Sequence, residues 1–183
     1  MDLAQLIEKW SASAASERAN KDSFLHDLCH ALGVEPPHPK TGDPDRDRYV
    51  FEREAVLVHG GERHSVGFID LYKHGHFLLE AKQGSDAGSK KTGTARRDTP
   101  AWHVAMQEAF GQALTYASTI EPPPPFLIVT DIGYCFDLYA SFDGSRNYRK
   151  FPDALSARIS LTSLASEPQH AFETPEGRRW RPA

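Results

Sequence analysis

The run Phe68-Ile-Asp-Leu-Tyr-Lys-His-Gly-His-Phe-Leu-Leu-Glu-Ala-Lys82 places one acidic residue in each of two apolar segments. Their composition and the turn residues around Gly75 predict two adjacent strands of a sheet. A carboxylate in such a strand costs free energy when its face is buried, unless a partner or a metal ion compensates it. Asp70, Glu80 and Lys82 are therefore the first candidates for a functional site.

The register of the two strands decides whether these side chains meet. Side chains alternate across a strand, so Glu80 and Lys82 share one face of the sheet. A three-residue turn with Gly75 at a positive φ pairs Asp70 with Glu80 and brings it to that face. A two-residue turn would instead place the two carboxylates on opposite faces. The functional interpretation therefore carries a register condition.

Convergent carboxylates favour a cation. At a separation of about 5 Å they repel by roughly 3 kcal/mol at an effective dielectric near 20, and a hard divalent ion removes that penalty. Mg²⁺ binds one or two carboxylates together with waters and phosphate. Lys82 would then orient or deprotonate an attacking water, or stabilise charge on the phosphate. The alternative is a surface strand whose three charged groups face water in a weak cross-strand pairing.

The bulk properties of the chain are those of one soluble domain. It has 183 residues, of which 39% are hydrophobic and 25% charged, and a net charge of −4 that gives no overall attraction to nucleic acid. Neither an apolar run of ~18 residues nor a secretory signal is found. Cys29 and Cys135 are expected to be buried, reduced thiols, so a cytoplasmic location and no membrane contact are predicted.

Hydrophobic periodicity predicts an α/β fold, a sheet with helices packed on its faces. One domain is expected over residues 1–164, followed by a poorly structured tail over 165–183. The expected helices span Leu3 to Trp10, Ser13 or Ser16 to Gly33, and Thr99 to Ala117. The expected strands are Tyr49–Val58, Ser65–Lys73, Phe77–Lys82, Phe126–Asp131, Tyr134–Phe142 and a weaker one around Arg158–Leu161.

The strand–turn–strand placement of these residues resembles the core of the PD-(D/E)XK nucleases, with Asp70, Glu80 and Lys82 in the motif positions. The resemblance implies a restriction-endonuclease-like core, in which a central mixed sheet with an antiparallel meander is flanked by helices. It also implies a Mg²⁺-dependent endonuclease that hydrolyses phosphodiester bonds of double-stranded DNA. Asp70 and Glu80 would bind the metal, and Lys82 would assist the nucleophile.

Further residues match features of this superfamily. Gln112-Ala-Leu-Thr-Tyr116 matches the Gln-X3-Tyr motif that follows the core in RecB-like members, and its two ends share a helix face. An acidic residue from the preceding helix often completes the metal site, and Glu17 corresponds to it. Gln83 is a weaker site neighbour. Alternatively, Glu17 is a favourable charge in a first helical turn, and Gln112 with Tyr116 is a polar pair at a core edge.

A closer resemblance, over roughly residues 10–162, is to the N-terminal nuclease domain of MmeI-like type IIL restriction–modification enzymes, which are DNA methyltransferase–endonuclease fusions. Five segments carry it: Ser16-Glu-Arg-Ala-Asn20, Phe24-Leu-His-Asp-Leu-Cys29, Phe68-Ile-Asp-Leu71, Phe77-Leu-Leu-Glu-Ala-Lys-Gln83 and Phe126-Leu-Ile-Val-Thr-Asp-Ile-Gly133.

In that family a connector, a methyltransferase and a target-recognition domain follow the nuclease domain. The motifs of those parts are not found, so no adenosylmethionine site is expected in this chain. The chain would be a fragment, a truncated reading frame or one subunit of a split system. In the last case a separate methyltransferase and target-recognition subunit would be its partner. The competing hypothesis is a non-catalytic module that binds DNA or a methyltransferase.

The long Gly-rich segment Gln83–Thr99 carries a basic cluster of Lys90, Lys91, Arg96 and Arg97. A structureless loop longer than about 12–15 residues is usually functional or disordered. Phosphate contact beside a nuclease site is the favoured interpretation of the cluster, and a solvated loop is the alternative.

Overall fold

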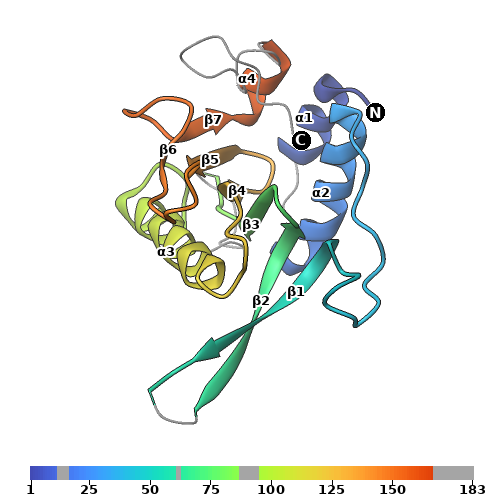
Figure 1. Ribbon diagram of the computed structural model, residues 1–183. Coiled ribbons are helices and arrows are strands. Elements are labelled where there is room, and N and C mark those ends of the chain that lie inside the picture. The colour runs from blue at the N-terminus through green and yellow to red at the C-terminus, as the bar shows by residue number, and fades with distance from the viewer. Residues whose placement is uncertain (12–16, 61–62, 87–94, 167–183) are drawn as a thin grey trace.

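The computed structural model describes residues 1–11, 17–60, 63–86 and 95–166. It is an α/β fold in which helices pack on both faces of a seven-stranded mixed sheet (Figure 1). The elements are α1 Leu3–Ser11, α2 Glu17–Leu32, β1 Tyr49–Val58, β2 His64–Lys73, β3 Phe77–Lys82, α3 Pro100–Ala117, β4 Phe126–Asp131, β5 Cys135–Ala140, β6 Arg149–Lys150, β7 Arg158–Ser160 and α4 Leu161–Ser166.

The sheet is antiparallel except at one junction. Its strand order is β1-β2-β3-β4-β5-β6, and β7 pairs with β5. Strands β3 and β4 run parallel, which requires a crossover connection, and α3 supplies it. The expected meander of β1, β2 and β3 is confirmed by the antiparallel pairing of each neighbouring pair.

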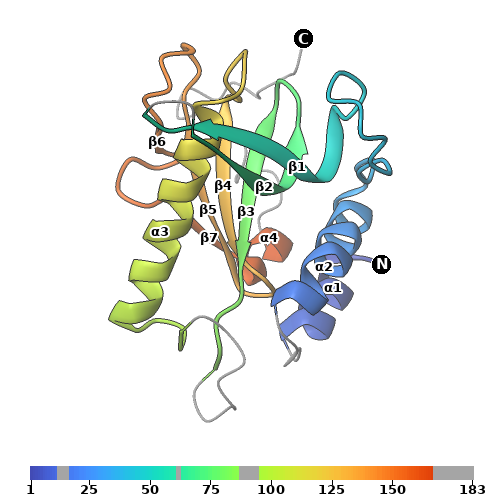
Figure 2. The same ribbon diagram turned by 90° about the horizontal axis from the view of Figure 1, so that it is seen from below.

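Two cores lie on opposite sides of the sheet. Helices α1 and α2 cover one face and α3 covers the other (Figure 2). On the first side, Phe24 and Leu25 of α2 pack with Leu71, Leu79 and other buried residues. On the other side, α3 presents buried alanines to the sheet, and their small side chains allow the helix to approach it closely. Asp70 lies within β2, and Glu80 and Lys82 lie in the last three residues of β3.

The start of α3 follows the expected capping chemistry. The Thr99 side chain accepts a hydrogen bond from the backbone N–H of Trp102 at 3.4 Å, and Pro100 occupies the first turn. Both cysteines are buried and free, as expected. In the described part of the chain, no helix has the length and apolar character needed to cross a membrane.

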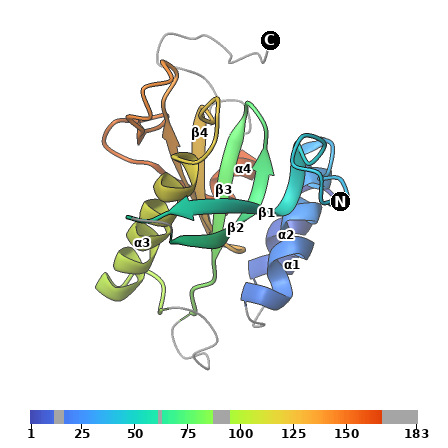
Figure 3. The same ribbon diagram turned by 60° about the horizontal axis from the view of Figure 1, so that its bottom comes forward.

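The β1–β2 hairpin changes direction near its middle. The pairs Phe51–Leu71 and Arg53–Ile69 flank Glu52, whose φ is +51°. Figure 3 shows the outer half of the hairpin crossing in front of the other strands toward α3. The positive φ of Glu52 is a local distortion of β1 at the level of Asp70 on its neighbour β2.

The C-terminal elements differ from expectation. Helix α4 follows β7 directly and ends two residues beyond the predicted domain limit of 164. Leu161 and Leu164, one turn apart, are buried and join the core that α1 and α2 cover. A helix of six residues is too short to show periodicity, which explains why the sequence did not predict it. The remaining part of the predicted tail, residues 167–183, lies outside the described ranges.

Candidate functional site

Asp70 and Glu80 lie opposite each other where β2 and β3 separate. The last pair in their ladder is Leu71 with Leu79, so the next positions in register are Asp70 and Glu80. Gly75 has a φ of +70° in the connecting turn. The register condition stated for the sequence is therefore confirmed.

The Asp70 carboxylate is held from two directions. Its Oδ2 accepts the backbone N–H of Ala81 at 2.7 Å, and its Oδ1 accepts from Nζ of Lys21 at the same distance. The ladder between β2 and β3 ends just before this point, so the side chain of Asp70 provides the acceptor for Ala81 that a ladder carbonyl would otherwise supply. Asp70 thereby has a defined orientation at the opening between the strands.

Glu80 is the buried carboxyl group of the site. It is 1% exposed, and its Oε1 has no hydrogen-bond partner among the described residues. Burial, together with the negative charge of Asp70, raises the pKa of Glu80 to about 8. An ionised oxygen in such a position is destabilising without a partner, so the metal-free site favours the protonated form of Glu80.

Lys21 of α2 is the cation that pairs with Asp70. It bonds Asp70 and also the carboxylate of Glu52 on β1. Burial would lower the pKa of its ammonium group, but the hydrogen bonds to Asp70 and Glu52 outweigh burial and raise that pKa above its usual value. The side chain is therefore a positive charge fixed between β1 and β2.

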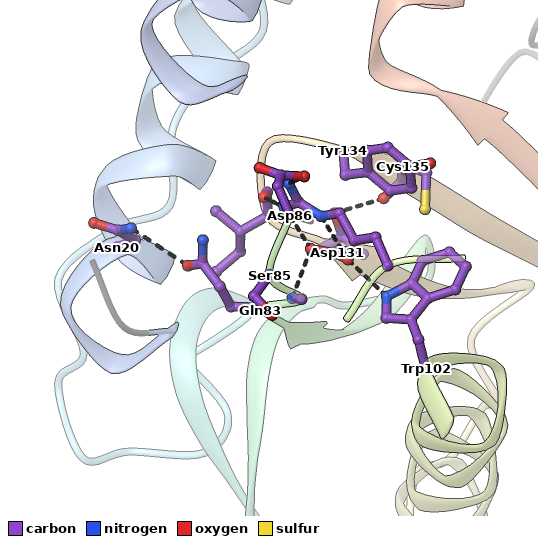
Figure 4. A network of polar contacts seen from close by, with 12 residues as sticks. Asn20, Gln83, Ser85, Asp86, Trp102, Asp131, Tyr134 and Cys135 are labelled. Carbon is purple, nitrogen blue, oxygen red and sulfur yellow. Dashed lines mark hydrogen bonds and ion pairs between the residues drawn. The ribbon is translucent and has the colours of Figure 1, made fainter. Parts of the chain in front are cut away.

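Glu17 lies near Asp70 and Lys82, and the backbone of Gln83 contacts Glu17. Burial and the charge of Asp70 raise the pKa of Glu17, while the ammonium of Lys82 and the backbone N–H of Gln83 act in the opposite direction. The side chain of Gln83 is buried and its Oε1 accepts from Nδ2 of Asn20 at 3.3 Å (Figure 4). The structure thus brings Glu17 and Gln83, both predicted from the sequence, to the carboxylate and lysine site.

The acidic groups form a pair rather than a larger ligand cluster. Within the described ranges, no group of three or more His, Cys, Asp or Glu side chains is arranged to hold a metal ion. Glu17 is therefore a neighbour of the pair and does not form one such group with it. A pair of carboxylates still suits Mg²⁺, which completes its shell with waters and phosphate. The observation that fits such an ion is the Oε1 of Glu80, which has no hydrogen-bond partner in the part of the chain that the structure describes.

A buried carboxylate on β4 fixes the chain just after Lys82. Asp131 pairs in register with Lys82 and is fully buried. It accepts a hydrogen bond from Trp102 Nε1 at 2.7 Å (Figure 4). It also accepts hydrogen bonds from the backbone of Gly84 at 3.0 Å and from Arg97 Nε and Nη2 at 3.1 and 2.9 Å. A Cβ at position 84 would lie 2.6 Å from Asp131 Oδ2, which explains the glycine. This network holds the strand end that carries Lys82.

The four residues predicted to contact DNA differ in their surroundings. The Arg97 side chain is only 8% exposed, and besides Asp131 its guanidinium bonds Asp86 and the carbonyl of Ile132. These contacts correct the expected phosphate contact: Arg97 is a structural residue that closes the base of its loop. Arg96 is exposed and keeps its proposed role. Lys90 and Lys91 lie outside the described residues.

Gln112 and Tyr116 meet each other on α3. Gln112 Nε2 donates to the Tyr116 hydroxyl at 2.9 Å, and the tyrosine ring covers Gly67 of β2. A Cβ on Gly67 would lie 2.5 Å from that ring. This arrangement matches the alternative of a polar pair at the core edge, and it supports β2 three residues before Asp70.

Sequence reasoning missed Lys21, Glu52 and the structural role of Asp131. Lys21 could have been identified from the sequence, because it follows Glu17 by one helical turn and therefore lies on the same helix face. Asp131 ends an apolar strand, where a charge needs a partner. The role of Glu52 depends on a backbone distortion that no residue in the sequence marks.

The sequence was also compared with models of known protein families. A model described as "MmeI, N-terminal domain" matches residues 1–181. The chain belongs to this family. Searches of curated proteins and of solved structures each found no match. The MmeI N-terminal domain model extends through the predicted tail to residue 181 and confirms the family resemblance that the sequence carried. It also places the chain among restriction-enzyme-related modules.

Proposed function

We propose that this MmeI N-terminal domain is a Mg²⁺-dependent DNA endonuclease module of the PD-(D/E)XK type, which hydrolyses phosphodiester bonds of double-stranded DNA. The observation that supports it best is the buried carboxyl of Glu80, with one oxygen unpartnered among the described residues, directly beside Asp70. Lys82 follows on the same face of β3. Family membership gives independent support for a restriction-enzyme-related role.

Asp70 and Glu80 are the groups that would hold the cation. Their oxygens are hard ligands of the kind Mg²⁺ prefers, and Asp70 is already oriented by the Ala81 N–H at 2.7 Å. A bound divalent ion would activate water for attack and neutralise charge on the phosphate. Glu80 must give up its proton to act as a ligand, which its raised pKa makes dependent on pH.

Lys82 is the proposed partner of the nucleophile. Its position two residues after Glu80 directs both side chains to one face of β3. Asp131 and Gly84 hold the backbone after Lys82, while Glu17 balances its charge from α2. Lys82 can then orient or deprotonate the water, or stabilise the charge that develops on the phosphate.

DNA contact would come from local groups of this chain, and target choice from another part of the system. With a net charge of −4, affinity for DNA would come from local groups such as Arg96, Lys90 and Lys91. Sequence recognition and methylation would come from a separate methyltransferase and target-recognition subunit. This chain would bind Mg²⁺ and no adenosylmethionine, and would act in the cytoplasm.

One observation favours a second candidate, a non-catalytic module that binds DNA or a methyltransferase. The ion pair of Lys21 with Asp70 already neutralises one carboxylate without a metal. In that case DNA or partner binding would survive Glu80→Ala, and no cleavage would accompany it. The two candidates therefore differ in a single assay of cleavage.

The test is cleavage of supercoiled plasmid by the purified chain in Mg²⁺. We expect nicked or linear product from the wild type, and none in EDTA or with Lys82→Ala. Lys73→Ala, on the neighbouring strand, is the matched control and should cleave like the wild type. Cleavage that persists in Lys82→Ala or in EDTA would reject the proposed site.

A further inference from the structure

Asp70 already has a cationic partner within the chain. Lys21 Nζ lies 2.7 Å from Asp70 Oδ1, and the Lys21 side chain is 12% exposed. The same ammonium also bonds Glu52. Lys21 therefore lies on an oxygen of one of the two carboxylates that make up the candidate metal centre.

This position has an electrostatic consequence for any divalent ion at the centre. Two cations that share one carboxylate lie within roughly 5 Å of each other, and even in a water-like dielectric their repulsion changes affinity on the order of tenfold. The interaction is stronger where the groups are partly buried, as here. Lys21 and a divalent ion therefore compete for Asp70.

We propose that Lys21 is a built-in counter-ion of this centre, which neutralises Asp70 while no divalent ion is bound and lowers the affinity of the centre for that ion. The inference rests on the proposed function, because it takes Asp70 and Glu80 as the metal ligands. Glu52 offers the ammonium a second acceptor. Lys21 can therefore release Asp70 to the ion and remain paired with Glu52.

A purely structural clamp would predict the opposite effect. If Lys21 served only to orient Asp70, its removal would leave the carboxylate less ordered and weaken metal binding. Asp70 has a second anchor, however, because its Oδ2 accepts the backbone N–H of Ala81 at 2.7 Å. The orientation of Asp70 therefore survives the loss of Lys21, and the electrostatic effect dominates.

The test measures binding of Mn²⁺ and Mg²⁺ alone to the metal-free full chain by calorimetric titration, without DNA. We expect Lys21→Met to bind Mn²⁺ about tenfold more tightly than the wild type, and Lys21→Arg to restore the wild-type affinity. Lys40→Met is the matched control. Lys40 donates to the backbone carbonyl of Glu52 and to the Glu54 carboxylate. The Lys40→Met substitution therefore removes one positive charge nearby, while the ion pair of Lys21 with Asp70 remains. Its affinity should remain within about twofold of the wild type.

The outcomes separate this inference from the proposed function. If the wild type binds Mn²⁺ and loses binding in Glu80→Gln, but Lys21→Met binds equally or more weakly, the counter-ion role is rejected and the metal centre stands. If neither the wild type nor Lys21→Met binds either ion, both proposals fail. Circular dichroism of each variant confirms folding, and Lys21→Gln repeats the test if the methionine variant does not fold.

Discussion

Replacing Glu80 with glutamine should remove a pH dependence from the stability of the metal-free protein. The carboxyl of Glu80 has a pKa of about 8 in the fold, against an ordinary value of 4.5 in the unfolded chain. Between these values the folded chain keeps a proton that the unfolded chain has released. The free energy of unfolding therefore falls as the pH rises through this window.

The size of the effect follows from the two pKa values. Between pH 5 and pH 8 the buried carboxyl lowers the free energy of unfolding by about 3 to 4 kcal/mol. Glutamine has nearly the same shape and does not titrate, so Glu80→Gln lacks this loss. Relative to the wild type, the variant should gain that amount of stability over the interval.

Urea unfolding in EDTA at several values between pH 5 and pH 8 measures the effect directly. Glu108→Gln on the exposed side of α3 is the control, and its stability difference from the wild type should not change over the same interval. If the difference between Glu80→Gln and the wild type is also constant with pH, then Glu80 is not a buried carboxyl of raised pKa. The main support for the metal site would then be lost.

Three further outcomes are expected. Mg²⁺ should bind more tightly at pH 8 than at pH 6, by up to roughly fifty-fold, because Glu80 must lose its proton first; a calorimetric titration at each pH measures it, and equal affinities would contradict the assignment. Arg97→Met should lower the free energy of unfolding by about 3 to 5 kcal/mol in urea, because the buried carboxylate of Asp131 loses its cationic partner. The control Arg96→Met should change that free energy by less than about 0.5 kcal/mol. Gly67→Ala should cost about 1 to 3 kcal/mol in thermal unfolding, because its Cβ would overlap the Tyr116 ring; an unchanged melting temperature would contradict this close contact.

Local patterns in the sequence were sufficient for most elements of the sheet, although the two-residue strand β6 was not predicted. The residues around Gly75 reduced the β2–β3 register to two alternatives, a three-residue turn and a two-residue turn. The observed pairing and the positive φ of Gly75 correspond to the three-residue turn. Thr99 and Pro100 likewise marked the start of α3, since capping depends on adjacent residues. These features arise from contacts between residues close in the chain, which a sequence displays directly.

The environment of the candidate site could be predicted only in part. Glu17 and Gln83 were expected as neighbours of the site. The structure places Glu17 in the electrostatic surroundings of Asp70 and Lys82, and the backbone N–H of Gln83 against Glu17. The pairing of Lys21 with Asp70 depends on how α2 packs across β2, which periodicity does not determine.

Arg97 is a residue whose role was predicted wrongly because its partner is distant in the sequence. A basic residue in a Gly-rich loop favours phosphate contact by composition. The structure instead buries its guanidinium against Asp131, a residue 34 positions away. Short-range pattern cannot distinguish a cation for DNA from one for a buried carboxylate. The distinction appears only once β4 and the loop after β3 are placed side by side.

The most direct test of the nuclease assignment is cleavage by the chain when it is tethered to DNA. Fusion to an unrelated sequence-specific DNA-binding domain supplies the affinity that a net charge of −4 does not. In Mg²⁺ the wild-type fusion should cut close to the tethered site, and the Lys82→Ala fusion should bind equally well without cutting. A folded wild-type fusion that occupies the site in Mg²⁺ and leaves the DNA intact would contradict the account.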